Sequence, residues 1–263
     1  MNRYYSLFKI NVKNMFAYRW ALLLGLFLSM ISELFYIFVW IAVYSFSKIS
    51  TLHGITLTGM VVYFFVVGSI SFLNWPEIAE EIGDDLRSGG IARYLIRPLR
   101  YIYAAFVSLM PETVLFIAFG SVPVLIIIYM LAALHTSAMA IVAFAFEVLL
   151  AFLLINLIGI ILGSLSIYVV DIFGITTGLF ILFSLIGGGA MPITLFPKPI
   201  YNILMLTPFP YLYFVPAATF TGMLAINELP GLIAIEIAWI AILLVVSIFA
   251  WKKASRNLNS VGV

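Results

Sequence analysis

Four acidic residues stand inside long apolar stretches of the sequence: Glu33, Glu112, Glu147 and Glu236. A carboxyl group is costly to keep ionised inside a lipid bilayer, so residues of this kind are candidates for carrying a proton or a cation. Glu33 lies 13 residues beyond Trp20, which corresponds to about 20 Å along a helix. Glu112 lies at a similar depth in its own stretch. We expect Glu33, and then Glu112, to face a pathway through the membrane. The alternative is a protonated or hydrogen-bonded carboxyl that faces the inside of a helix bundle.

A second group of chemically active residues forms one charged segment. Residues 77–100, EIAEEIGDDLRSGGIARYLIRPLR, hold nine of the 24 charged residues of the chain. The segment is acidic as far as Leu86 and basic from Arg87 onward. Because charges are costly in lipid, we expect this segment to stand in water and to face a partner there.

The pattern within the segment predicts two short helices. Ile78, Ile82 and Leu86 recur every four residues and form one apolar stripe, while charged residues occupy the other faces. The flanking charges that we assign to a docking surface are Glu77, Glu81, Asp85 and Arg87. Ser88, Gly89 and Gly90 end the first helix, and a basic helix containing Arg93 and Arg97 follows. A solvated loop that binds lipid headgroups is one interpretation. The stripe favours the other, in which it fits a groove on a cytoplasmic partner.

The sequence contains no recognisable catalytic machinery. It has no cysteine and two histidines, and it lacks the GxxxxGK[S/T], HExxH and GxSxG motifs. We therefore predict no enzyme active site, no metal site and no cofactor in this chain, and nothing suggests a nucleic-acid partner.

The elements that must position these residues are membrane helices. The chain is 65% hydrophobic and 9% charged, whereas soluble domains are about one quarter charged. A helix of about 20 apolar residues spans a bilayer, and six apolar stretches are long enough, at about 21–46, 55–74, 101–131, 138–169, 172–194 and 232–251. Eleven of the thirteen basic residues then fall on one side of the membrane, which puts both termini in the cytoplasm. We predict an all-α integral membrane protein with one transmembrane domain, residues 1–263.

Three further features complete this expectation. An amphipathic helix at about residues 3–19 suits the cytoplasmic membrane surface. A proline-rich, aromatic segment at 192–231 suits short re-entrant or interfacial helices on the outer side. Two small-residue pairs allow close helix packing, either within the subunit or between subunits: Gly159 with Gly163, and Gly174 with Gly178.

This set of features resembles the permease subunit of type-2 ATP-binding-cassette (ABC) exporters over essentially the whole chain. The stretch SGGIARYLIRPL, residues 88–99, is the most specific local similarity and looks like one bacterial branch of the family. The resemblance implies a cytoplasmic membrane location, a dimer with a second copy or a paralogous permease, and a separate ATPase subunit that holds ATP and Mg²⁺. It also implies that residues 77–87 act as the coupling helix and that lipids, glycans, drugs or peptides are exported by alternating access.

Two other functions remain open from the sequence. An ion-coupled secondary transporter or channel would use Glu33 and Glu112 and would need no ATPase. A membrane scaffold would transport nothing, and its partners would be membrane lipids and other proteins.

Overall fold

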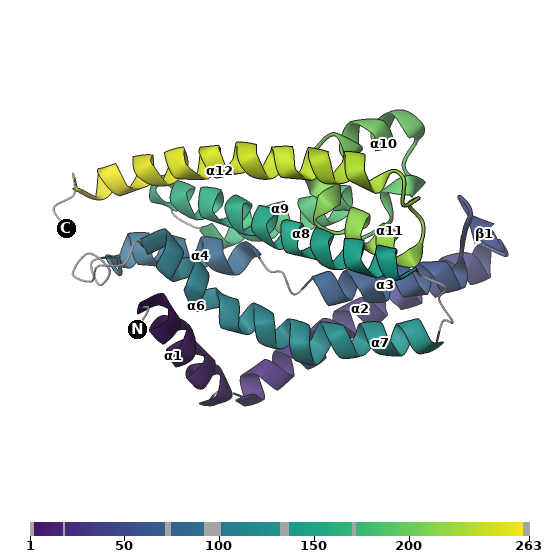
Figure 1. The fold of residues 1–263 in the computed structure, drawn as a ribbon, viewed down its shortest axis with the longest axis horizontal. Helices are drawn as coiled ribbons and strands as arrows, with labels where there is room; N and C mark the ends of the chain where they lie inside the picture. The colour runs from purple at the N-terminus through teal and green to yellow at the C-terminus, as the bar shows by residue number, and fades with distance from the viewer. Residues whose placement is uncertain are drawn as a thin grey trace.

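The computed structural model describes residues 3–17, 19–71, 75–91, 101–131, 137–169 and 172–259, and within these ranges the regular secondary structure is helical apart from one small hairpin. The long helices lie side by side along the longest axis of the molecule (Figure 1). They are α2 (Arg19–Ser47), α3 (Leu57–Ile70), α4 (Trp75–Ser88), α6 (Tyr101–Phe116), α7 (Val122–Leu131), α8 (Ala138–Leu165), α9 (Ile172–Gly187) and α12 (Leu229–Asn259). Among them, α4 continues in the direction of α3 as α7 continues in that of α6 (Figure 1).

The two ends of this bundle differ. One end, which we call the hairpin end, carries the two-stranded hairpin β1 (Thr51–Leu52) and β2 (Ile55–Thr56) and the short helix α10 (Lys198–Met205) (Figure 1). The other end, which we call the terminal end, carries the last turns of α4 and α12 and the N-terminal helix α1 (Arg3–Ala17). The predicted helix at about 3–19 is therefore present as α1, which packs against α6.

Within the described residues, three helical segments are long and apolar enough to cross a membrane: Tyr101–Met130, Ala138–Tyr168 and Leu229–Arg256. They coincide with the third, fourth and sixth predicted spans. The other three predicted spans correspond to shorter apolar stretches of helix, which are Ile31–Ser47 within α2, Leu57–Ile70 and Ile172–Gly187. Six complete crossings therefore stay a prediction, while the all-α architecture is confirmed.

The segment at 192–231 does fold into short helices, but it is not wholly interfacial. Alongside α10 it contains the single turns η3 (Ile193–Leu195) and η4 (Phe209–Tyr211) and the helix α11 (Phe214–Thr221). α11 is buried over most of its length and packs against α8 and α3, whereas Ile203 on α10 is 65% exposed. The aromatic residues of α11 explain why this helix is buried, since Phe220 packs edge-on against Phe144 of α8 with ring centroids 5.0 Å apart.

The core at the hairpin end is centred on α3, whose side chains Met60, Tyr63 and Phe64 are fully buried. The Tyr63 hydroxyl donates a hydrogen bond of 2.7 Å to the carbonyl oxygen of Gly188. Gly188 follows the last residue of α9 and has φ +93°. A side chain there would collide with Phe214 and the Tyr63 hydroxyl, so this position requires glycine, and α9 ends just before it.

Candidate functional site

The acidic half of the charged segment forms α4, and α4 ends where the sequence predicts. The helix runs from Trp75 to Ser88, and Gly89 then adopts φ +70°, a conformation that glycine accepts without strain. Gly90 continues the turn. The second predicted helix, which is basic and contains Arg93 and Arg97, lies outside the described residues.

The apolar stripe of α4 is buried within this chain. Ile78 and Ile82 are 0% exposed and Leu86 is 5% exposed. They form a cluster with Ile160 of α8 and residues of α6. The interpretation that the stripe enters a groove on a partner is therefore wrong, because the groove is provided by the protein's own helices.

Small residues allow α4 to approach its neighbours closely. A Cβ atom added to Gly163 of α8 would lie 2.7 Å from the Ile82 Cβ and 3.0 Å from the Ala79 carbonyl oxygen. On the α4 side, a Cβ atom at Gly83 would lie 3.2 Å from the side chains of both Ile172 and Ser166. These contacts fix α4 against the junction of α8 and α9, so a displacement of α4 must also displace those two helices.

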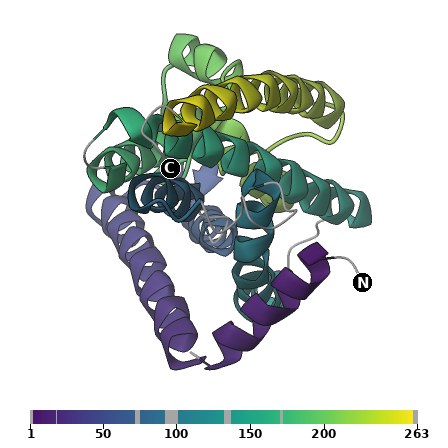
Figure 2. The same ribbon diagram turned by 90° about the vertical axis from the view of Figure 1, so that its left-hand side faces the viewer.

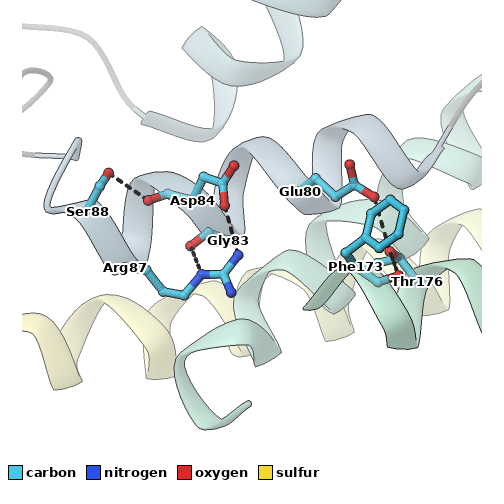
Figure 3. Close-up of polar contacts among 7 residues, drawn as sticks. All are labelled: Glu80, Gly83, Asp84, Arg87, Ser88, Phe173 and Thr176. Atoms are coloured by element: carbon cyan, nitrogen blue, oxygen red, sulfur yellow. Dashed lines mark hydrogen bonds and ion pairs between the residues drawn. The ribbon is translucent and has the colours of Figure 1, made fainter. Parts of the chain in front are cut away.

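Polar contacts reinforce the same junction. The Thr176 hydroxyl of α9 lies 3.2 Å from the Glu80 carboxylate of α4, and it also lies 3.0 Å from the carbonyl oxygen of Phe173 (Figure 3). On the opposite face, the Tyr101 hydroxyl donates a 3.0 Å hydrogen bond to the buried carboxylate of Asp85. The Tyr101 ring stacks on Trp251 of α12 with centroids 4.9 Å apart. Asp85 thus serves the internal packing of α4 rather than a docking surface.

The exposed part of α4 is its last turn. Asp84 and Arg87 form an ion pair of 2.8 Å, and their side chains are 74% and 37% exposed. The Arg87 Nε donates to the Gly83 carbonyl oxygen at 3.3 Å, and the Ser88 hydroxyl donates to that of Asp84 at 2.7 Å (Figure 3). Viewed from the terminal end, α4 lies near the centre of the molecule (Figure 2). Glu77 and Glu81, the other predicted contacts, are only partly exposed.

The predicted pathway acids lie on separate helices. Glu33 of α2 lies against Gly68 of α3, and Glu112 is partly buried on α6. Within the described residues, no hydrogen bond or ion pair links the two carboxyl groups. The structure instead brings together Glu147 and Glu236, two acids whose proximity could not be judged from the sequence.

The two glycine pairs have different surroundings. Gly159 and Gly163 are buried on α8, and Gly163 contacts α4 as described above. Gly174 and Gly178 are exposed on α9, and a Cβ atom at Gly178 would meet nothing within 4 Å. Packing within the subunit therefore accounts for the first pair and not for the second.

Long apolar helices, a charged helix held against two of them and a largely apolar surface define an all-helical protein that is embedded in a membrane. The chain belongs to the ABC-2 family transporter proteins, since the model of that family matches residues 20–262. It is thus a permease subunit of an ABC-2 type transporter, and permeases of this family generally work with an ATPase subunit. No curated protein matches the sequence.

Proposed function

We propose that this permease is the membrane subunit of an exporter that moves an amphipathic substrate out of the cytoplasm by alternating access. The substrate class is a lipid, glycan, drug or peptide. A separate ATPase subunit binds ATP and Mg²⁺, docks at the terminal end of the bundle and drives the cycle. The observation that carries this proposal is the placement of α4, whose stripe is fixed to α8 while its last turn stays exposed.

The packing of α4 provides a route by which movement of the ATPase reaches the membrane helices. Closure of the ATPase pair would displace the exposed turn at Asp84 and Arg87. Because Ile82 and Gly163 are in close contact, α8 must follow this displacement, and the Thr176–Glu80 contact extends it to α9. A helix packed in this way transmits movement, whereas a flexible solvated loop would absorb it.

Charge supports a cytoplasmic position for the terminal end. Lys252, Lys253 and Arg256 lie on the last turns of α12 at this end, exposed or partly exposed. Positive residues accumulate on the cytoplasmic side of membrane proteins. The ATPase and its nucleotide are found on that side, so the terminal end suits the docking of this partner.

A second permease subunit would complete the transporter. The exposed small residues Gly174 and Gly178 give α9 a face on which another helix can pack closely. A copy of this chain and a paralogous permease are both compatible with this face.

The docking surface is tested by exchanging two charges. In the variant D84R/R87D the intrahelical ion pair is kept with its direction reversed, and the net charge of the chain is unchanged. The matched control is K198E/E228K, which exchanges two exposed charges at the hairpin end. Tagged protein is purified from native membranes, and the co-purifying ATPase is quantified by mass spectrometry.

We expect the D84R/R87D variant to lose about tenfold or more of the ATPase, because like charges that meet across an interface cost several kcal/mol and 1.4 kcal/mol is tenfold in affinity. The control should retain the ATPase at the level of the unmodified chain. Normal recovery with D84R/R87D would refute docking at this turn. If the unmodified chain recovers no ATPase at all, the transporter assignment with a separate ATPase fails.

A further inference from the structure

Two carboxyl groups meet inside the bundle, away from α4. Glu147 lies on α8 and is 0% exposed, and Glu236 lies on α12 and is 1% exposed. The two carboxyl groups are near enough to interact electrostatically. Because α8 and α12 both begin at the hairpin end (Figure 1), these residues lie about 14 Å and about 11 Å along their helices from that end.

All four carboxyl oxygens of this pair lack a hydrogen-bond partner in the described part of the chain. A third polar group lies with them, since the Thr219 hydroxyl of α11 is placed to donate a hydrogen bond to the Glu147 carboxyl. Thr219 is 2% exposed. Three helices therefore direct polar atoms to one buried place.

No positive side chain is available from these helices to neutralise the pair. Neither α8 nor α11 contains Lys, Arg or His, and α12 contains none before Lys252. The other titratable group facing the pair is Tyr211 of η4, which interacts with Glu236. Its hydroxyl donates to the carbonyl oxygen of Met205 at 2.9 Å, and Tyr201 of α10 lies within electrostatic reach of Tyr211.

Two unneutralised carboxylates would be incompatible with this packing. An isolated buried charge costs many kcal/mol, and two like charges in contact repel each other. The ligand that removes this cost must be positive and very small, because both side chains are already enclosed. A proton meets both conditions, and a carboxylic acid O–H can donate to the facing carboxylate.

We propose that Glu147 and Glu236 form a proton-binding site that connects α8, α11 and α12. The pair retains at least one proton whenever these helices are packed. Loss of the last proton leaves two buried negative charges within electrostatic reach of each other and loosens α11 and α12 from α8. The site therefore makes the packing of the hairpin end dependent on pH, also when no ATPase is bound.

The direction in which stability changes with pH follows from the protonation state of the pair that the packed helices favour. The packed state favours the protonated pair, whereas in the unfolded chain both acids are ionised above about pH 4. The stabilisation is present in acid and is lost as pH rises. Glutamine keeps the shape of glutamate and carries no charge at any pH.

The experiment uses the purified permease in lipid nanodiscs and needs no ATPase, so its outcome is separate from that of the docking test. Melting temperature is followed from mildly acidic to alkaline buffer in choline chloride. The infrared carbonyl band of protonated carboxylic acids is recorded at neutral pH. The variants are E147Q, E236Q and the double variant, and the control is E228Q, which removes an exposed acid close to the start of α12.

We expect the melting temperature of the unmodified protein and of E228Q to fall as pH rises, and that of the double variant to stay level. We also expect part of the carboxylic acid band to disappear in the double variant. An unchanged band together with an unchanged pH profile would overturn the proposal. The proposal would also be overturned if NaCl stabilised the unmodified protein more than choline chloride does and the double variant lost this difference. The pair would then hold a metal cation. The single variants keep the test decisive if the double variant folds poorly, because each of them removes one of the two acids from the band.

Discussion

The strongest structural prediction concerns one substitution made at two glycines, G163A and G178A. In G163A the added Cβ atom lies 2.7 Å from the Ile82 Cβ and 3.0 Å from the Ala79 carbonyl oxygen. Both atoms belong to the rigid part of α4, so α4 must move away from α8. Overpacking of this kind costs about 1–3 kcal/mol, against which alanine gains about 1 kcal/mol in helix propensity. We expect a net loss of about 0–2 kcal/mol.

G178A provides the matched control. A Cβ atom there meets nothing within 4 Å, so only the propensity gain of about 1 kcal/mol remains. The two variants should therefore differ by about 1–3 kcal/mol. At about 2–4 °C for each kcal/mol in a chain of this size, their melting temperatures should differ by about 2–12 °C.

The assay is thermal unfolding of both variants in the same detergent, followed by the fluorescence of the five tryptophans. G163A should melt below the unmodified protein and G178A at or above it. If G163A melts as high as G178A, the close packing of α4 on α8 is absent. The proposed transmission from α4 to α8 would then lose its basis.

Three other contacts are tested by substitution. I82D should prevent recovery of folded permease, rather than only its association with an ATPase, because Ile82 is 0% exposed and an unpaired charge there is strongly unfavourable; folded protein that lacks only the ATPase would contradict this. Y101F should lower the free energy of unfolding, measured by denaturation, by about 1–3 kcal/mol through loss of the hydrogen bond to Asp85. D85N should lower the free energy of unfolding less in the Y101F variant than in the unmodified protein. G68A should destabilise the protein because its Cβ atom overlaps the Glu33 side chain, and E33A should restore the stability of G68A; additive effects of the two substitutions would refute the contact.

Periodicity was sufficient to predict where helices lie. The four-residue spacing of Ile78, Ile82 and Leu86 and the glycines that follow them predicted a helix ending near Ser88, and α4 ends there. The apolar stretches likewise predicted the positions of the long helices. These features are local, since spacing and glycine chemistry act within a few residues of the chain.

The partner of an apolar stripe could not be predicted in the same way. Spacing shows that a face is buried, and it does not show which surface covers it. The stripe of α4 is covered by α8 and α6 of the same chain. One signal for this arrangement was present in the sequence, because a small-residue pair on α8 ends at Gly163, which is the residue that accommodates Ile82.

The carboxyl pair was missed for a similar reason. Glu147 and Glu236 are far apart in the chain, and their contact depends on α8 and α12 lying side by side in the same direction. Their depths did offer a signal, since each acid follows the start of its helix by a similar number of residues: nine for Glu147 in α8 and seven for Glu236 in α12. Matching depth is not sufficient, however, since Glu33 and Glu112 also lie at similar depths in helices that run in the same direction. Which of two such helices pack against each other is a tertiary feature that the spacing of residues does not contain.

Both proposed sites depend on α8. Gly163 near one end of this helix contacts α4, and Glu147 nearer the other end contacts α12. Gly163 lies 16 residues beyond Glu147, which is about 24 Å of helix. A continuous helix is stiff over this length, so a displacement of α4 at the terminal end also changes the contact of α8 with α12 at the carboxyl pair. Movement imposed by an ATPase would therefore alter the protonation of the pair, and by linkage the protonation of the pair must bias the position of α4 by the same free energy.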